Sequence, residues 1–227
     1  IHWTVESGDW WIIAGSHGSG KSALLQTLAG LIPLGAGELT AFGESITATG
    51  RRAGGWHREV ALVFEGGGRL LRDLTVIENI ALPLGYHRNL SPVDAVEAVI
   101  PLVQALELER IAEASAGRIG RAWSQRVALA RALAVGPELL LLDNPLAGMD
   151  RHHLGWWRQF LTRLAQGHPI LGSRPLTLVV TADDPRPWVD PNRKAALIDD
   201  GRWRLVGTLG TAQAERNATY TDWLQPD

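Results

Sequence analysis

A glycine-rich segment near the start of the chain carries the residue types best suited to chemistry. Residues 15–22 read Gly-Ser-His-Gly-Ser-Gly-Lys-Ser. The glycines allow backbone conformations and a close approach to a ligand that side chains would block. Successive backbone N–H groups can then face inward and form an anion site where a helix begins. The predicted phosphate-binding residues are Gly15, Ser16, His17, Gly18, Ser19, Gly20, Lys21 and Ser22.

The residues on either side of this loop supply the context that the chemistry needs. Residues 10–14 form an apolar run short enough for a buried strand, and residues 23–28 carry leucines at helical spacing. A G-x-x-x-x-G-K-S sequence between a strand and a helix is the P-loop pattern. In that pattern Lys21 reaches the β- and γ-phosphates of a nucleotide, and the Ser22 hydroxyl ligates Mg²⁺. The alternative is a Gly/Ser-rich turn with a chance Gly-Lys-Ser, which the complete pattern and its context disfavour.

An aspartate after a later strand complements the loop. Four leucines at 139–142 predict a strand buried on both faces, and Asp143 follows at its carboxyl end. Ligands of open α/β sheets bind at that end of the strands. Asp143 is therefore predicted to hold Mg²⁺ opposite Ser22. The alternative is an aspartate that begins a turn before Pro145.

The composition limits the class of protein. The chain has 227 residues, 45% of them hydrophobic, which suits one α/β domain or a core with a small insert. A net charge of −2 argues against broad binding to nucleic acid or to an anionic membrane. There is no cysteine, which is compatible with a cytosolic protein. No apolar run reaches the length of a transmembrane helix, so we expect no direct insertion into a membrane.

The remaining elements must position these residues. Predicted strands or hairpins lie at 35–46, 60–64, 176–181 and 195–206. Predicted helices occupy most of 75–135, including one that begins at Ser91-Pro92, and then 152–165 and part of 208–227. Residues 48–58 predict a surface loop.

With these motifs in place, the chain resembles the nucleotide-binding domain of an ABC transporter over nearly its whole length. A helical insert separates the P-loop from Asp143, and Gln125-Arg126-Val127-Ala128-Leu129-Ala130-Arg131-Ala132-Leu133 follows that insert. Residues 74–84 and 147–150 match the family's segment after the Q-loop and its D-loop. Residues 81–84, Ala-Leu-Pro-Leu, further resemble the Mla-type ATPases that drive lipid transport with MCE-domain proteins.

The resemblance implies an architecture and a set of partners. The fold would be a RecA-like P-loop NTPase of the α/β class, with a mixed, mainly parallel sheet. Its ATP-binding core would cover residues 1–65 and 126–227, with an α-helical subdomain inserted at 66–125. The family binds ATP and Mg²⁺, works as a homodimer or heterodimer, and contacts a transmembrane permease. That assignment places the chain in the cytoplasm, peripheral on the inner face of the cell membrane.

Two positions depart from the family pattern around the chain's own P-loop. Asn144 stands where the family carries a catalytic Glu, and an amide accepts no proton at neutral pH. A general base contributes about 10²–10⁴-fold to a rate, so we expect impaired hydrolysis. Ala182 replaces the switch His that contacts the γ-phosphate, and its methyl group makes no hydrogen bond. Asp183, the next residue, is expected to be structural.

Two further departures follow, one in the LSGGQ motif of the helical subdomain and one at Glu65, beside the chain's own P-loop. The family's LSGGQ motif, which contacts the partner's ATP, falls on Ile119, Gly120, Arg121, Ala122 and Trp123. Side chains at 121 and 122 impede close backbone approach. Arg121 is either a guanidinium for the partner's phosphate or an exposed residue beside a lost motif, and the second is favoured. Glu65 replaces the Q-loop glutamine and joins Ser22 and Asp143 as a candidate Mg²⁺ ligand.

These observations favour an ATP-binding subunit of an ABC transporter with impaired hydrolysis. It would bind Mg-ATP through residues 15–22 and contact a permease through a groove near residues 65–74, with phospholipid as a candidate substrate. The alternative is a nucleotide-gated regulatory or scaffold pseudo-ATPase that takes no direct part in transport. A DNA-repair ATPase is disfavoured because no long coiled coil interrupts the chain.

Overall fold

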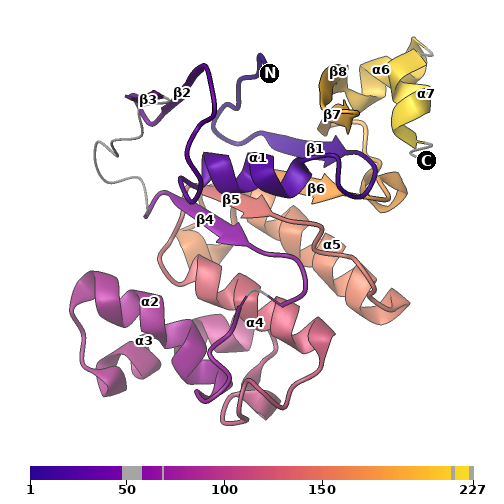
Figure 1. Ribbon diagram of the computed structural model, residues 1–227. Helices are drawn as coiled ribbons and strands as arrows, with labels where there is room; N and C mark the ends of the chain where they lie inside the picture. The colour runs from indigo at the N-terminus through magenta and orange to yellow at the C-terminus, as the bar shows by residue number, and fades with distance from the viewer. Residues whose placement is uncertain (48–57, 68, 216–217, 225–227) are drawn as a thin grey trace. The chain divides into compact units, whose positions relative to one another are not determined.

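A computed structural model describes residues 1–47, 58–67, 69–215 and 218–224 (Figure 1). Its contacts divide the chain into two compact units. The first unit comprises residues 1–62, 138–144 and 177–227, and the second comprises 63–137 and 145–176. The predicted division at residues 65 and 126 stays a prediction. The surface loop predicted at 48–58 lies, apart from residue 58, outside the described residues.

A six-stranded sheet is the centre of the fold, with the strand order β4-β5-β6-β1-β7-β8. β1 pairs in parallel with both β6 and β7, and β5 pairs in parallel with β6, whereas β7 and β8 are antiparallel. The prediction of a mixed, mainly parallel sheet is thereby confirmed. The strands are β1 (Trp10–Ala14), β4 (Val60–Val63), β5 (Leu139–Leu142), β6 (Thr177–Ala182), β7 (Lys194–Asp199) and β8 (Arg202–Thr208).

The central strands form where the sequence is apolar on both faces. Ile12, Ile13 and the last three leucines of β5 are fully buried, as expected for strands inside a parallel sheet. Helix α1 (Lys21–Leu28) buries Leu25 in the same core cluster, together with Val179 of β6. This packing fixes the helix that follows the glycine-rich loop against the sheet that precedes it.

The register of the central strands aligns their carboxyl ends. Ala14, the last residue of β1, lies opposite Ala182, the last residue of β6. Leu142 of β5 lies opposite Val180. The loops that leave β1, β5 and β6 therefore begin at neighbouring points of one sheet edge, which is where ligands bind in such sheets.

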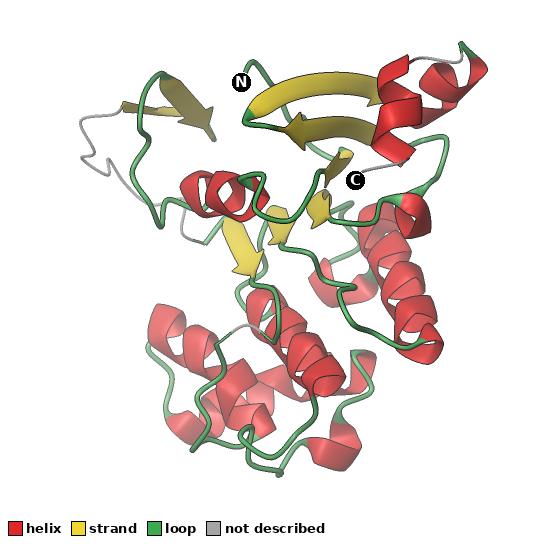
Figure 2. Cartoon of the chain, turned by 45° about the vertical axis from the view of Figure 1, so that its right-hand side comes forward, coloured by secondary structure: helices red, strands yellow, loops and turns green. Residues whose placement is uncertain are grey.

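Smaller elements complete the first unit. β2 (Glu38–Ala41) and β3 (Glu44–Thr47) form a separate hairpin, as predicted. Figure 2 shows the long β7–β8 hairpin beside two short helices, α6 (Leu209–Ala214) and α7 (Ala218–Leu224), both of which contact β8. One helix and a tail were predicted for this last region, so that prediction was only partly correct. A 3₁₀ turn, η3 (Arg186–Trp188), follows β6.

The second unit is helical. Its helices are α2 (Val76–Arg88), α3 (Pro92–Ala105), α4 (Arg121–Leu133) and α5 (Arg151–Gly167), with 3₁₀ turns η1 (Glu109–Ile111) and η2 (Pro169–Leu171). α2 and α3 pack side by side (Figure 1), and a Cβ at Gly85 would lie 3.3 Å from the Ala95 methyl group. α3 begins at the predicted Ser91 cap, whose hydroxyl accepts the Asp94 N–H at 3.2 Å.

A buried asparagine ties the loop before α2 to the helix. Asn79 is inaccessible to solvent, accepts the Leu71 N–H at 2.8 Å and donates to the carbonyls of Leu71 and Thr75 at 2.9 Å. Thr75 and Glu78 add a capping box at the same end. None of the helices in the described part of the chain has the length and hydropathy needed to cross a membrane.

Candidate nucleotide-binding site

The glycine-rich loop occupies the turn from β1 into α1. Gly18 and Gly20 have φ angles of 80° and 102°, a region that side chains rarely adopt. A Cβ at Gly15 would meet the Ile198 carbonyl oxygen and lie 2.8 Å from Ser19 Oγ, so only glycine fits there. The first N–H groups of a helix have no intrahelical acceptors, and at the start of α1 no side-chain cap accepts from them. The loop thus offers donors to an anion.

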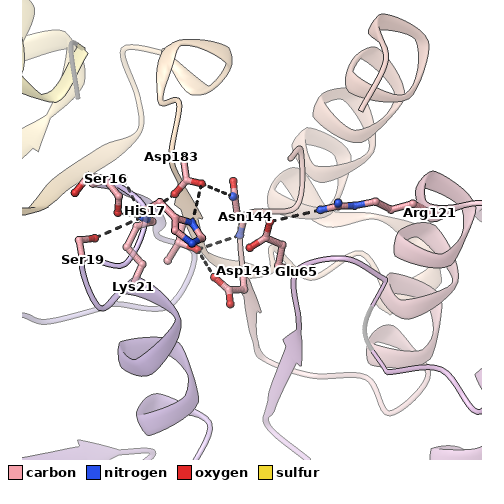
Figure 3. A network of polar contacts seen from close by, with 11 residues as sticks. Ser16, His17, Ser19, Lys21, Glu65, Arg121, Asp143, Asn144 and Asp183 are labelled. Atoms are coloured by element: carbon pink, nitrogen blue, oxygen red, sulfur yellow. Dashed lines mark hydrogen bonds and ion pairs between the residues drawn. The ribbon is translucent and has the colours of Figure 1, made fainter. Parts of the chain in front are cut away.

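Lys21 is buried at the base of this loop, with 5% of its surface exposed. Its ammonium group donates to the Gly15 and Ser16 carbonyls at 2.8 Å each and lies 3.5 Å from Ser19 Oγ. It also forms an ion pair with Asp183 Oδ1 at 2.8 Å (Figure 3). An ammonium has three N–H donors, so these contacts use its full capacity.

Asp183 connects the lysine to a second strand end. Its Oδ2 accepts the Asn144 side-chain N–H at 2.9 Å and lies 4.0 Å from Nδ1 of the exposed His17 (Figure 3). Sequence reasoning predicted only a structural role for Asp183 and missed this contact with Lys21. The available signal was its position directly after β6, beside the strand that leads into the loop.

Asp143 is held in place by Thr181. The Asp143 carboxylate is 5% exposed, and its Oδ1 accepts a hydrogen bond from the Thr181 hydroxyl at 2.9 Å. Thr181 Oγ1 in turn accepts the Asn144 backbone N–H at 3.0 Å. One buried hydroxyl therefore fixes both the carboxylate and the first residue after it. Asn144 adopts φ 42°, a left-handed conformation that Asn tolerates better than most residues.

The first unit contains the oxygen ligands that Mg²⁺ would take. Ser22 presents an exposed hydroxyl in the first turn of α1, and the Asp143 carboxylate uses only Oδ1 in its bond to Thr181. Hard oxygen ligands of this kind suit Mg²⁺, which usually takes one or two protein groups and completes its shell with phosphate and water. The described residues include no group of three acidic, His or Cys side chains that would hold a metal by itself. The donor set therefore fits a metal that arrives with a nucleotide.

Glu65 and the residues at the start of α4 belong to the second unit. The Gln125 side chain binds the backbone on both sides of Glu65, accepting the Gly67 N–H and donating to the Phe64 carbonyl at 3.1 Å. Arg121 Nη2 lies 3.5 Å from Glu65 Oε1, and both side chains are exposed. Such a pair contributes about 0–1 kcal/mol. The predicted metal contact of Glu65 stays a prediction.

Trp123, at the start of α4, is packed against its neighbours. α4 begins after Gly120, and Ala122 and Trp123 lie in its first turn. The Trp123 ring lies edge-on to His153 at 5.4 Å, with the guanidinium of the buried Arg126 4.7 Å from its centre. Burial lowers the pKa of His153, and the neighbouring guanidinium lowers it further, while Asp150 opposes both. The predicted contact of residues 120–123 with a partner's ATP stays a prediction.

Comparison with known proteins decides the family. A model described as "ABC transporter" matches residues 1–147. The chain belongs to the ABC transporter family. The spermidine/putrescine import ATP-binding protein PotA of Trichodesmium erythraeum is 31% identical over 208 residues, which cover 92% of this chain and 51% of PotA. The phosphonates import ATP-binding protein PhnC of Trichormus variabilis is 30% identical over 218 residues, covering 93% of this chain and 85% of PhnC.

A solved structure of the family supports the same assignment. The dimeric structure of the bacterial ABC transporter cassette MJ0796 superposes with a TM-score of 0.75 at 25% identity, covering 90% of this chain and 88% of that one. The fold prediction is thereby confirmed, and the chain is an ATP-binding domain of an ABC transporter. It spans about half the length of PotA and 58% of the sulfate/thiosulfate import ATP-binding protein CysA of Methylococcus capsulatus.

Proposed function

We propose that the chain binds Mg-ATP through residues 15–22 and hydrolyses it weakly or not at all, while it couples binding to a membrane permease. The observation that carries the proposal is the Asn144 side chain, which donates its N–H to Asp183 at 2.9 Å. An amide is not a base at neutral pH, so Asn144 cannot take a proton from water. Ala182, buried at the end of β6, adds no polar group for a phosphate.

The nucleotide would be held by the N–H groups at the start of α1, by Lys21 and, through Mg²⁺, by Ser22 and Asp143. When bound, the metal supplies positive charge that offsets the phosphates. Residues 66–125 would form the helical subdomain, with Glu65 at its entry and residues 120–123 facing a second ATP-binding domain. The dimeric form of MJ0796 supports that arrangement.

For the transported substrate we propose a phospholipid, with an Mla-type permease on the inner face of the cell membrane. Residues 81–84 are the feature that supports this choice. The relatives named above import polyamines, sulfate or thiosulfate, and phosphonates, all of them small and polar. Transfer of labelled phospholipid between vesicles that contain the assembled transporter tests this choice, and transfer of a small polar solute instead would contradict it.

Phosphate release by the purified chain, alone and with its permease, tests the impairment. We expect calorimetry to show Mg-nucleotide binding that Lys21→Ala abolishes, with a turnover at least about 100-fold below the roughly 10 s⁻¹ common for enzymes. Turnover at ordinary rates would contradict impaired hydrolysis. Binding that persists in Lys21→Ala would contradict the assignment of the loop. Normal transport by a complex that lacks this chain would favour a regulatory pseudo-ATPase.

A further inference from the structure

The ammonium group of the P-loop lysine, Lys21, is already paired with a carboxylate. Asp183 Oδ1 lies 2.8 Å from the Lys21 ammonium, and the lysine side chain is only 6% exposed. Its other short contacts are with the Gly15 and Ser16 carbonyls of its own loop. A phosphate that enters the loop needs one of these N–H donors. Among the described residues in contact with Lys21, Asp183 carries the only full negative charge, so phosphate and Asp183 compete for the same ammonium.

The carboxylate is held in this position from two sides (Figure 3). Lys21 binds one oxygen, and the Asn144 side chain donates to the other at 2.9 Å. Asn144 is itself fixed, because its backbone N–H donates to the buried Thr181 hydroxyl at 3.0 Å. Asp183 is therefore a preorganised ligand of Lys21 rather than a surface acid that meets it by chance.

We infer that Asp183 is an internal competitor of phosphate for Lys21, and that it sets the nucleotide affinity of this site. The inference rests on the proposed function, because it requires phosphate to bind at residues 15–22. Nucleotide entry must break the ion pair, and the displaced carboxylate then stays close to the phosphates. Both effects weaken binding. Asn144 is a positioning residue, which acts through its hold on Asp183.

The test is calorimetric titration of the full chain with ADP, ATP and inorganic pyrophosphate, each with and without Mg²⁺. Asp183→Asn keeps the shape of the side chain and removes its charge. We expect it to tighten binding of all three probes about tenfold, or about 1.4 kcal/mol. Pyrophosphate has no adenosine, so its affinity reports binding by the phosphate loop alone. Asp183→Ala, which removes the contact altogether, should tighten binding at least as much.

Asp184→Asn is the matched control. Asp184 is adjacent and carries the same charge, but it pairs with the exposed Arg186 at 2.7 Å. We expect less than about a twofold change. Asn144→Ala releases one oxygen of Asp183 and should tighten binding about threefold, and it should add nothing in the Asp183→Asn background. A purely structural role for Asn144 would not produce that dependence. Thermal unfolding of each variant confirms that it is folded.

Three outcomes overturn the inference. Unchanged affinity in Asp183→Asn would show that no competition exists. Weaker binding only with Mg²⁺ present would show that Asp183 serves the metal instead. In either case binding by the wild-type chain, abolished by Lys21→Ala, leaves the proposed function standing. If no variant, Asp183→Asn included, binds nucleotide or pyrophosphate, the proposed function and the inference are both wrong.

Discussion

Replacing Asn144 with aspartate should turn a stabilising contact into a repulsive one. The wild-type side chain donates to Asp183 Oδ2 at 2.9 Å. Aspartate has the same shape and also tolerates the φ of 42° at this position, so the backbone need not move. The substitution therefore changes one hydrogen bond and one charge.

The size of the effect follows from the contact. A hydrogen bond to a charged group contributes about 1.5 kcal/mol or more. Two unit charges about 4 Å apart repel by about 1 kcal/mol in water and about 4 kcal/mol at an effective dielectric constant of 20. The Asp183 side chain is 40% exposed and Lys21 lies 2.8 Å away, so the lower part of that range applies. We expect Asn144→Asp to lower the free energy of unfolding by about 3 kcal/mol at pH 8.

Thermal and urea unfolding at pH 8 and at pH 4 measure this loss in the free energy of unfolding. The carboxyl group introduced at position 144 has its pKa raised in the folded state by the neighbouring anion. A raised acid pKa favours folding at low pH, so the loss should be largest at pH 8 and shrink as pH falls toward 4. At pH 8 the midpoint should fall by about 10 °C. Asn89→Asp is the control, because Asn89 is exposed and also left-handed, with φ 52°.

Two results would refute the reasoning. The first is a loss at pH 8 no larger than that of Asn89→Asp. The second is a loss that does not depend on pH. Adding Asp183→Asn to Asn144→Asp restores one amide and one carboxylate in exchanged positions, so most of the stability should return. A double variant as unstable as the single one would show that the two side chains are not coupled.

The remaining predictions concern the loop, the buried hydroxyl and the packed histidine. Gly15→Ala places a methyl group against a backbone carbonyl of β7; calorimetry and urea unfolding should show lost nucleotide binding and about 1–3 kcal/mol lower stability. Thr181→Val leaves the Asp143 carboxylate and the Asn144 N–H without their partner, and should lower stability by about 2–3 kcal/mol and weaken Mg-nucleotide binding in the same assays. Burial lowers the pKa of His153 from 6.5, so the unfolded chain takes up the proton first and stability falls as pH drops through 6.5. His153→Gln should flatten that decline between pH 7 and pH 5 in urea titrations.

The fold was largely predictable because its strands and helix starts have strong local signals. The four leucines of β5 and the apolar run of β1 have the length and composition of buried parallel strands, and both were found there. Ser91 and Pro92 fixed the start of α3 in the same way. The last region was harder, because α6 and α7 have only six and seven residues, too short for a clear helical period.

Only those site residues were predictable that a motif or the end of a strand places. The positions of Lys21 and Asp143 follow from the motif and from the parallel order of their strands. The contact between Lys21 and Asp183 depends on side-chain geometry across loops far apart in the sequence, and the sequence signals it only through the position of Asp183 directly after β6. The burial of Arg126 against Trp156, at 3.7 Å, is of the same kind, since a charged residue on a helix ordinarily faces solvent.

The left-handed backbone at Asn144 also constrains how this chain could change over evolutionary time. A glutamate at this position would have to adopt φ 42° and face the Asp183 carboxylate at once. A chain that acquired that acid while Asp183 kept its charge would be less stable than the present one. Neutralising Asp183 first would remove that repulsion, so the order of the two substitutions sets the stability of the intermediate.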